Sequence, residues 1–343
     1  MSAQRRSVLV TGGAGFLGSA IARALLERGD PRRVRAMVRG ARPAERLRGL
    51  DVEVVPGDVT GPTTDLERLF ADVDEVFHAA GRLGGGGVTE LELHRVHVEG
   101  TVNVLRAASR AGVRRITYLS SPGLLGPSDS LLDEDAPPAP SNAYERSKAD
   151  AEAAVRALAA RVRTEVVFVR PEFVYGPGDV HVLRLFQAIL ARRFLLVSGG
   201  RAFCHPTFVG DAVSGILAAS DRGVAWRTYH VAGPRPVTIA ELATTFGEAV
   251  GVVPTLSVPA WLMVALATSS EAVAPLVGLA PPVTRSAVDF FARSRMFSTR
   301  RATAELGWRP AVDLAAGVSE AVAWYRTRGL LPDAPGRSGN RRA

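Results

Sequence analysis

The chain has 343 residues, of which 47% are hydrophobic, enough apolar material for one large or two smaller globular domains. The net charge of +8 comes from arginines spread along the chain with acids between them, so nucleic-acid binding is not expected. The single cysteine, Cys204, has no partner for a disulfide or a zinc site, which excludes a disulfide-stapled secreted protein and favours a reducing cytoplasm.

Short β-rich runs alternate with helical runs over the first half of the chain, as in a parallel sheet with helices on both faces. The predicted strands are Arg6–Thr11, Arg33–Val38, Val52–Pro56, Asp74–Ala79, Arg114–Ser120 and Glu165–Arg170. The predicted helices are Phe16–Arg28, Thr64–Ala71 (opened by a capping box, Thr64-x-x-Glu67), Glu90–Ala111 and Ala143–Arg161. This order predicts a Rossmann-type, doubly wound parallel sheet in an α/β protein.

After Gly176 the elements become shorter and prolines more frequent, which predicts a smaller C-terminal α+β substrate lobe with segments interleaved into the first domain. We expect a dinucleotide-binding domain over residues 1–175, the substrate lobe over 176–331 and a disordered tail over 332–343. The stretch from Trp261 to Leu279 has one charge, Glu271. It predicts two short buried or amphipathic helices and no membrane span, with a peripheral membrane contact as the alternative.

A glycine-rich turn follows the first predicted strand, in the sequence Thr11-Gly12-Gly13-Ala14-Gly15-Phe16-Leu17-Gly18. Glycines let the backbone approach a pyrophosphate, and the N-terminus of the helix that follows supplies N–H donors. The context of strand, turn and helix predicts a dinucleotide site, with an ordinary glycine-rich turn as the alternative.

Arginine occupies the place, at the end of the second predicted strand, where an acid would accept hydrogen bonds from ribose hydroxyls. Arg39 stands there with Arg42 close behind, and it favours the 2′-phosphate of NADP(H) over NAD(H). Stacking on adenine or plain solvation of Arg39 are the alternatives, so NAD(H) stays open. These residues belong to an arginine cluster of which a part is expected to face a phosphate: Arg32, Arg33, Arg35, Arg39, Arg42, Arg46 and Arg48.

The only lysine of the chain, Lys148, stands four residues after Tyr144 on a predicted helix. Residues at this spacing share a helix face, so we expect the ammonium to lower the phenol pKa from about 10 toward neutrality. Tyr144 would then donate and accept protons. The alternative is an exposed helix on which the two residues have no role. The long loop Ser121–Asn142 follows the end of a predicted strand, where ligands of such sheets bind.

Together, the glycine turn and Tyr144-x-x-x-Lys148 resemble the extended short-chain dehydrogenase/reductase family (NAD-dependent epimerase/dehydratase). The resemblance spans about residues 5 to 328. Its further motifs follow in order: Gly57-Asp58-Val59, Phe77-His78-Ala79-Ala80, Ser120-Ser121, Arg170-Pro171-x-x-Val174-Tyr175-Gly176 and Glu305-Leu306-Gly307-Trp308-Arg309-Pro310.

The resemblance implies that Ser121 holds the substrate oxygen while Tyr144 transfers the proton and Lys148 assists it; alternatively, Ser121 only caps the loop. It implies these cofactor contacts: Gly12, Gly15, Phe16, Leu17, Gly18, Arg39, Asp58, Val59, Ala79, Ala80, Lys148 and Pro171. One departure is His97, where the family usually has asparagine. His94 and His97 lack the further ligands that a metal site needs, so no metal is expected.

Three sites indicate the branch of the family. Pro122 and Gly123 replace the acids that dehydratases and decarboxylases place after the catalytic hydroxyl. Cys204 and a site near Val288 lack the arginines that grip a diphosphate in nucleotide-sugar epimerases, although Arg201 or Arg285 offers a substitute.

The replacements are apolar, in the segments Val258–Leu262 and Pro281–Arg285, and look like 3β-hydroxysteroid dehydrogenases and 3-oxoalkanoate reductases. This resemblance implies an NAD(P)-dependent oxidoreductase that interconverts a secondary alcohol and a ketone on a lipophilic substrate. A nucleotide-sugar 4-epimerase and a non-catalytic NAD(P)-binding protein are the alternatives. It also implies a homodimer formed through Glu90–Ala111 and Ala143–Arg161.

Overall fold

The computed structural model describes residues 7–29, 33–40, 45–84, 87–274, 278, 281 and 283–333. The chain divides into two compact units, each assembled from three segments. The first unit contains Met1–Glu172, Val209–Ala232 and Met296–Pro310. The second contains Phe173–Phe208, Gly233–Arg295 and Ala311–Ala343.

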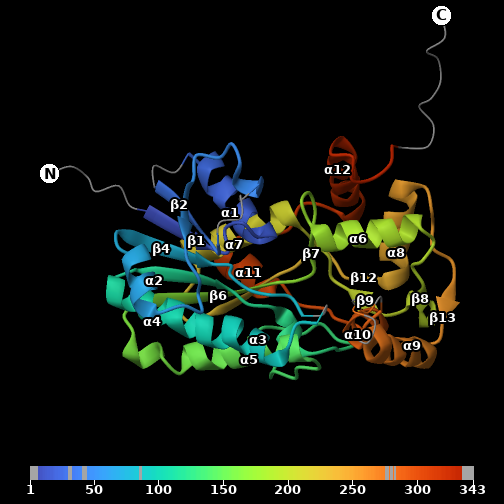
Figure 1. Ribbon diagram of the computed structural model, residues 1–343, viewed down its shortest axis with the longest axis horizontal. Helices are drawn as coiled ribbons and strands as arrows, with labels where there is room; N and C mark the ends of the chain where they lie inside the picture. The colour runs from blue at the N-terminus through green and yellow to red at the C-terminus, as the bar shows by residue number, and fades with distance from the viewer. Residues whose placement is uncertain are drawn as a thin grey trace, which may run out of the picture. The chain divides into compact units, whose positions relative to one another are not determined.

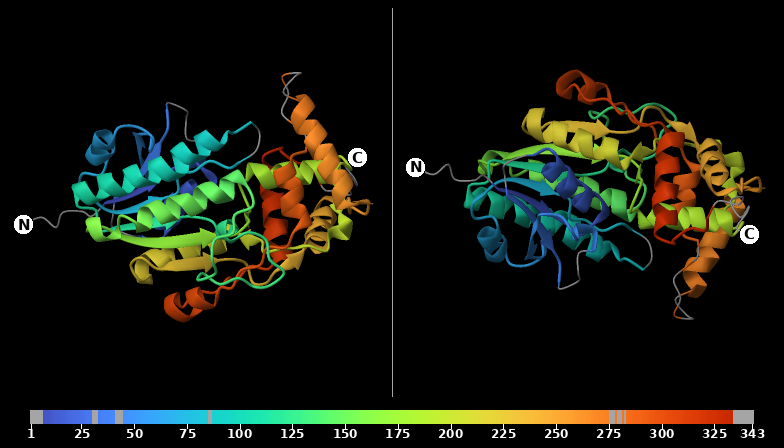
Figure 2. Two further views of the ribbon diagram at one scale, coloured as in Figure 1. Left: turned by 90° about the horizontal axis from the view of Figure 1, so that it is seen from below. Right: turned by 90° about the horizontal axis from the view of Figure 1, so that it is seen from above.

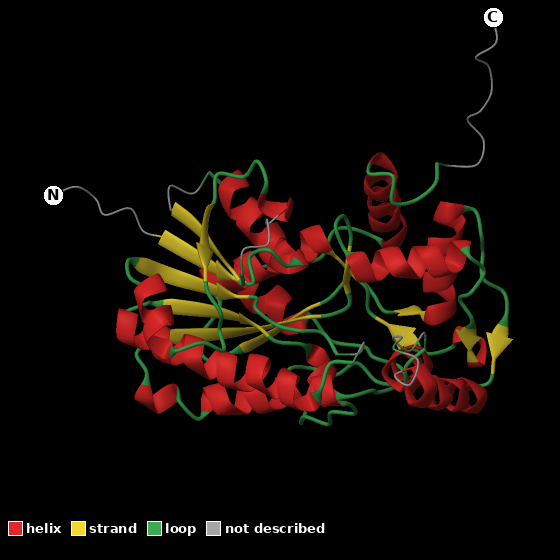
Figure 3. Cartoon of the chain, viewed as in Figure 1, coloured by secondary structure: helices red, strands yellow, loops and turns green. Residues whose placement is uncertain are grey.

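A parallel sheet forms the centre of the first unit (Figure 3). It has seven strands in the order β11-β6-β5-β4-β1-β2-β3. The strands are β1 (Ser7–Thr11), β2 (Arg33–Val38), β3 (Glu53–Pro56), β4 (Val73–His78), β5 (Arg115–Leu119), β6 (Glu165–Pro171) and β11 (Thr228–Val231). The chain order reverses between β1 and β4, which is the position where doubly wound sheets bind dinucleotides. The predicted Rossmann-type fold is confirmed.

Helices cover both faces of this sheet (Figure 1). Helices α1 (Phe16–Glu27) and α7 (Val209–Arg222) lie on one face; α2 (Thr63–Leu69), α4 (Gly100–Ala111) and α5 (Ala143–Arg156) lie on the other. Val8, Leu9 and Val10 in β1 are fully buried, as expected for a strand enclosed by helices on both sides. Helices α4 and α5 run side by side (Figure 2).

The predicted capping box at Thr64 and Glu67 is wrong. Helix α2 begins one residue earlier, with Pro62 at its N-cap and no side-chain cap, so Thr64 already lies inside the first turn. A capping box does form before α3 (Glu90–His94), between Thr89 and Glu92. The predicted helix Glu90–Ala111 is continuous but contains one π-helical turn, Arg95–Glu99, between α3 and α4.

The second unit contains helices and two-stranded sheets. Its helices are α6 (Val180–Leu190), α8 (Ile239–Val250), α9 (Ala260–Val273), α10 (Arg285–Ala292) and α12 (Leu314–Thr327). Its strand pairs are β7 (Val174–Tyr175) with β10 (Thr207–Phe208), β9 (Phe203–Cys204) with β12 (Val237–Thr238), and β8 (Leu196–Val197) with β13 (Ser257–Val258). Phe186 of α6 stacks on Phe246 of α8, with ring centroids 4.7 Å apart.

Part of the stretch from Trp261 to Leu279, for which two short helices were predicted, lies outside the described residues, namely 275–277 and 279. Its described part forms the single helix α9, in which only Met263 and Ala267 are buried while Trp261 is 72% exposed. No helix among the described residues combines the length and apolar character needed to cross a bilayer. Residues 334–343 of the expected tail lie outside the described residues.

Candidate active site

The glycine turn after β1 is packed too tightly for side chains. Gly12 has φ +68°, and a Cβ placed on it would lie 2.8 Å from the backbone nitrogen of Ala80. A Cβ on Gly18 would lie 2.2 Å from the Gly12 carbonyl oxygen. Gly15 is the N-cap of α1, so Phe16 and Leu17 form the first turn of the helix. This backbone cradle fits the pyrophosphate of a dinucleotide, which needs close backbone approach and a helix N-terminus.

A buried hydrogen-bonded chain joins β1, β4 and α4 beneath this turn. Thr11 Oγ1 accepts from the Ala80 N–H at 3.2 Å and is hydrogen-bonded to His78 Nδ1 at 2.7 Å. His78 Nε2 is hydrogen-bonded in turn to Thr101 Oγ1 at 3.0 Å. Burial and the nearby Lys148 cation lower the His78 pKa to about 3, so this imidazole is neutral. These hydrogen bonds hold Ala79 and Ala80 against the glycine turn.

The residues expected at the adenosine end lie at the carboxyl ends of β2 and β3. Arg39 directly follows β2 and is exposed. Asp58 Oδ1 accepts hydrogen bonds from the backbone N–H and the hydroxyl of Thr60, both at 2.9 Å. The Val59 side chain is buried in the core cluster and contacts the position of Gly100.

The arginine cluster separates into two groups. Arg33 and Arg35 form ion pairs with Glu53, at 2.9 Å and 3.2 Å, and therefore belong to the sheet edge. Arg46 contacts the glycine turn instead, because its Nη1 donates to the Ala14 carbonyl at 3.3 Å. Arg46 is one of seven arginines in the cluster, and nothing in the local sequence pattern distinguishes it from the other six. Arg32 and Arg42 lie outside the described residues.

Ser121, Tyr144 and Lys148 meet at the carboxyl end of β5. The Ser121 hydroxyl caps a short 3₁₀ helix by accepting from the Gly123 N–H at 3.2 Å, and it lies near enough to the Tyr144 phenol to lower the pKa of that phenol. Lys148 is 5% exposed, and its Nζ donates to the Leu119 carbonyl at 3.1 Å. Pro171 ends the neighbouring strand β6 and is buried.

The expected lowering of the Tyr144 pKa is wrong. Burial raises it to about 12, only partly offset by the nearby Ser121 hydroxyl, and Glu172 and Glu145 add to the increase. Lys148 does not reverse the shift, because its ammonium is directed at the Leu119 carbonyl and lies 5.5 Å from the Tyr118 ring. Burial lowers the pKa of Lys148 itself to about 8, and the Glu152 carboxylate opposes that change.

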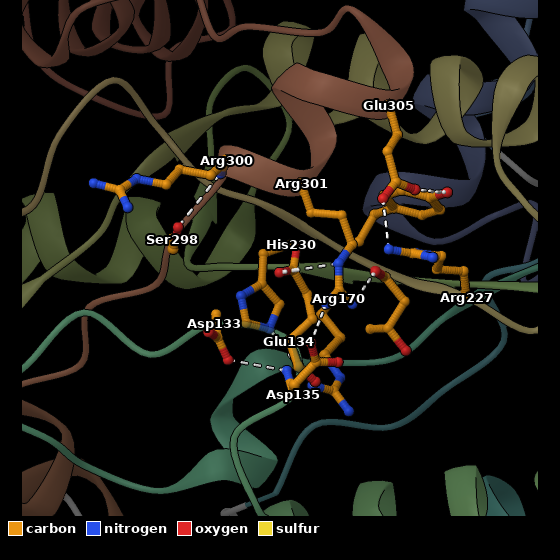
Figure 4. A network of polar contacts seen from close by, with 12 residues as sticks. Asp133, Glu134, Asp135, Arg170, Arg227, His230, Ser298, Arg300, Arg301 and Glu305 are labelled. Atoms are coloured by element: carbon orange, nitrogen blue, oxygen red, sulfur yellow. Dashed lines mark hydrogen bonds and ion pairs between the residues drawn. The ribbon is translucent and has the colours of Figure 1, made fainter.

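A polar network fixes the long loop that follows β5 (Figure 4). Glu134 in this loop accepts from the His230 N–H at 2.9 Å, and Asp135 pairs with Arg301. Arg170 holds both carboxylate oxygens of Glu152 at 2.8 Å, next to the loop. The loop Ser121–Asn142 is therefore tied to β11 and to helix α11 (Arg300–Leu306), beside the Arg170–Glu152 pair of β6 and α5.

Comparison with known proteins agrees with this geometry. The model of the NAD dependent epimerase/dehydratase family matches residues 8–232. A ketoreductase of Stigmatella aurantiaca, named for 4-hydroxy-2-methyl-3-oxo-4-farnesyl-3,4-dihydroquinoline-1-oxide, is 34% identical over 71% of this chain and 73% of its own length. Sterol demethylase protein B of Methylococcus capsulatus is 31% identical and covers 95% of this chain and all of its own length.

Two further proteins are similar over nearly the whole chain. The 2-alkyl-3-oxoalkanoate reductase of Stenotrophomonas maltophilia is 30% identical over 91% of this chain and 97% of its own length. The solved structure of MoeE5 in complex with UDP-glucuronic acid and NAD has a TM-score of 0.75 at 26% identity, covering 94% of this chain and 99% of that one. The chain thus belongs to the NAD dependent epimerase/dehydratase family of extended short-chain dehydrogenases/reductases, and it is an NAD(P)-dependent oxidoreductase.

Proposed function

We propose that the protein interconverts a ketone and a secondary alcohol, with Tyr144 as the acid and base of the reaction. The observation that carries the proposal is the buried Lys148, which donates to the Leu119 carbonyl at 3.1 Å and so joins the helix that carries Tyr144 to the end of β5, two residues before Ser121. A serine hydroxyl and a phenol held at the same strand end can both donate to one carbonyl oxygen.

In the reducing direction, Ser121 and Tyr144 donate hydrogen bonds to the substrate carbonyl and polarise it. A nicotinamide cofactor held at the glycine turn would supply the hydride for the carbonyl carbon. Tyr144 transfers its proton to the oxygen, so the C=O bond becomes CH–OH and the phenol becomes a phenolate. Lys148, one turn further along α5, is the positive charge that we propose stabilises this phenolate once it forms. Solvent then returns the proton to Tyr144, and oxidation follows the reverse order.

A lipophilic substrate is supported by the two places where nucleotide-sugar relatives are expected to carry arginine. Cys204 is 1% exposed in β9 and Val288 is 2% exposed in a core cluster of the second unit, so neither offers a cation to a diphosphate. Arg285 is engaged with Glu271 at 2.7 Å, whereas Arg201 is exposed. The names of the three relatives above contain farnesyl, sterol and alkyl groups, which agrees with an apolar ligand.

The assay that tests this proposal measures NADPH and NADH oxidation with steroid, polyketide-like and 3-oxoacyl ketones. Turnover of at least one hydrophobic ketone, abolished by Tyr144→Phe, is the expected result. Turnover that survives Tyr144→Phe would reject the assignment of the acid. No turnover with any ketone, combined with tight cofactor binding, would favour a non-catalytic NAD(P)-binding protein.

A nucleotide-sugar 4-epimerase is the second candidate, because MoeE5, whose structure contains UDP-glucuronic acid and NAD, has the same fold. Calorimetric measurement of the affinity for UDP-glucose and dTDP-glucose distinguishes this candidate from the ketone and alcohol oxidoreductase proposed above. Micromolar affinity for either sugar nucleotide would transfer the protein to the epimerase group.

NADP(H) is the cofactor that we propose, because Arg39 follows β2 without an acid beside it and Arg46 reaches the glycine turn from the next segment. We also propose a homodimer formed through the continuous helix of α3 and α4 together with α5. Light scattering coupled to size exclusion tests the dimer directly.

A further inference from the structure

His97 lies in the middle of the π-helical turn Arg95–Glu99 and is 1% exposed. A π turn inserts one extra residue into an α-helix, so it changes the direction of the side chains that follow and is often found at functional sites. Here the turn directs an imidazole into the space between β4 and α5. The reaction described above does not use this buried ring.

Both nitrogens of His97 have partners, and the partners define the tautomer. Nε2 lies 3.0 Å from the backbone N–H of Arg82 and must accept from it. The ring proton therefore sits on Nδ1, which donates to Ser147 Oγ at 2.8 Å. Ser147 in turn donates to the backbone carbonyl of Tyr144 at 2.7 Å. The hydrogen bonds run in one direction, from the loop after β4 through the imidazole to the start of α5.

The ring also contacts the groups expected to do the chemistry. It packs edge-on against the Tyr144 ring, with centroids 5.5 Å apart and planes at 83°. A Cβ placed on Gly81 would lie 3.5 Å from His97 Nε2 and 3.8 Å from Lys148 Nζ, so all three groups meet at one point. His97 therefore touches the loop, the phenol and the surroundings of the ammonium.

This arrangement requires a neutral imidazole. A proton on Nε2 would place two donors, the ring N–H and the Arg82 N–H, face to face. It would also add a second buried cation near Lys148. Burial and that cation lower the His97 pKa to about 2. His97 is thus a fixed bridge with one donor and one acceptor at every pH where the protein works.

We propose that His97 is a positioning residue that sets the spacing between the loop at residues 79–82 and the Tyr144–Lys148 face of α5, and so shapes the pocket for the nicotinamide end of the cofactor. This inference rests on the proposed function of Tyr144 and Lys148. It assigns a distinct task to each ring nitrogen. Nε2 holds the loop that the cofactor contacts, and Nδ1 holds the helix that carries the phenol.

Two amide substitutions separate these tasks, because their polar atoms lie at different distances from Cβ. Asparagine carries its amide at the same number of bonds from Cβ as Nδ1, so His97→Asn keeps the donor for Ser147 and loses the acceptor for Arg82. Glutamine carries its amide as far out as Nε2, so His97→Gln keeps the acceptor and loses the donor. His97→Ala removes both, and His94→Ala, at an exposed residue of α3, is the matched control.

The experiment measures NADPH and NADH dissociation constants by calorimetry, kcat and KM with a ketone substrate, and the melting temperature of each variant. His97→Ala should weaken cofactor binding by about tenfold and lower kcat by a similar or larger factor. Cofactor affinity should return toward the wild-type value in His97→Gln, and kcat should return in His97→Asn. His94→Ala should match the wild type in both quantities.

Equal behaviour of the Asn and Gln variants would overturn the division of tasks, as would losses that follow only the melting temperature. Cofactor affinity unchanged in every His97 variant would overturn the proposal as a whole. The calorimetric measurement needs no substrate, so it decides the role of His97 even if no ketone is turned over and the proposed function fails. The Asn and Gln variants each keep one hydrogen bond, so the comparison remains available if His97→Ala does not fold.

Discussion

Lys148 donates a hydrogen bond from Nζ to the backbone carbonyl of Leu119, at 3.1 Å, and thereby joins the first half of α5 to the last residue of β5. Ser121 lies two residues beyond Leu119, and Tyr144 lies one turn before Lys148 on the same helix. This one hydrogen bond therefore holds the three proposed catalytic side chains near one another. The same contact fixes the ammonium in a buried position, where its size and charge both matter.

Lys148→Arg should abolish most of the activity although the charge is kept. The planar guanidinium is larger than an ammonium and does not fit a pocket that leaves Lys148 5% exposed beside the Tyr118 ring. We expect kcat to fall by about 10² or more. Arg146→Lys, at an exposed position of the same helix, is the control and should keep full activity. A fully active Lys148→Arg enzyme would show that the pocket does not select the ammonium.

Tyr144→Phe should leave cofactor affinity within about twofold and lower kcat by about 10² or more, the usual scale of a positioned proton transfer. Ser121→Ala should lower kcat as well, because it removes one of the two donors to the carbonyl oxygen. Steady-state kinetics together with cofactor calorimetry check both variants. If Ser121→Ala changed neither kcat nor KM, Ser121 would only cap the 3₁₀ helix through Gly123.

The ketone-reducing activity should decline as the pH rises above about 8. Burial lowers the Lys148 pKa to about 8, so above this pH the ammonium loses its proton and with it the charge that stabilises the Tyr144 phenolate. His78 and His97 face the same space, but their pKa values lie far below this range, so neither imidazole produces the change. The pH dependence of kcat at saturating cofactor checks the prediction. A flat profile from pH 7 to about 10 would contradict it.

Arg39→Asp should shift the cofactor preference toward NAD(H) by about tenfold or more, the effect expected when a charge-assisted contact of about 1.5–3 kcal/mol is lost. Titrating NADPH and NADH against the wild type and the variant measures the shift. Arg48→Asp makes the same charge change at an exposed residue of the same cluster and should leave the ratio unchanged. A wild type that already binds NADH more tightly would reject the interpretation of Arg39.

Local pattern was enough to predict six strands of the sheet and the glycine turn, because enclosed strands and tight turns require particular residues at short spacing. The seventh strand, β11, was not predicted: it has four residues and depends on pairing with the distant β6. The Tyr144–Lys148 spacing placed both residues on one helix, yet the predicted direction of the phenol pKa was wrong. Spacing reports which charges are near, whereas desolvation depends on everything packed around the group.

His97 illustrates the same limit at the site. Its identity as a departure from the family pattern could be read from the sequence, but its partners Arg82 and Ser147 come from different segments of the chain. The π turn that directs the ring inward cannot be recognised from a helical pattern that continues on both sides. Folding alone brings the loop, the imidazole and α5 together.

Glu152→Ala should destabilise the first unit strongly, because it leaves a buried guanidinium without its counter-charge. Arg170 and Glu152 are each 6% exposed at their side chains and share two hydrogen bonds of 2.8 Å. Removal of one partner of such a pair typically costs about 3–5 kcal/mol of unfolding free energy. Urea unfolding, with the m-value checked for constancy, measures the loss.

The matched control is Glu90→Ala, which breaks the ion pair of Glu90 with Arg146 at 2.8 Å. Both side chains of that pair are about half exposed, 48% for Arg146 and 65% for Glu90, so water replaces the lost partner and the cost should stay below about 1 kcal/mol. The two ion pairs have the same nitrogen–oxygen distance of 2.8 Å, so the expected difference in their contribution to stability comes from burial. If Glu152→Ala also lowered the unfolding free energy by less than about 1 kcal/mol, the ion pair with Glu152 would contribute little to the fold. Arg170 would then be satisfied by the Glu134 carbonyl and His230, each at 3.5 Å.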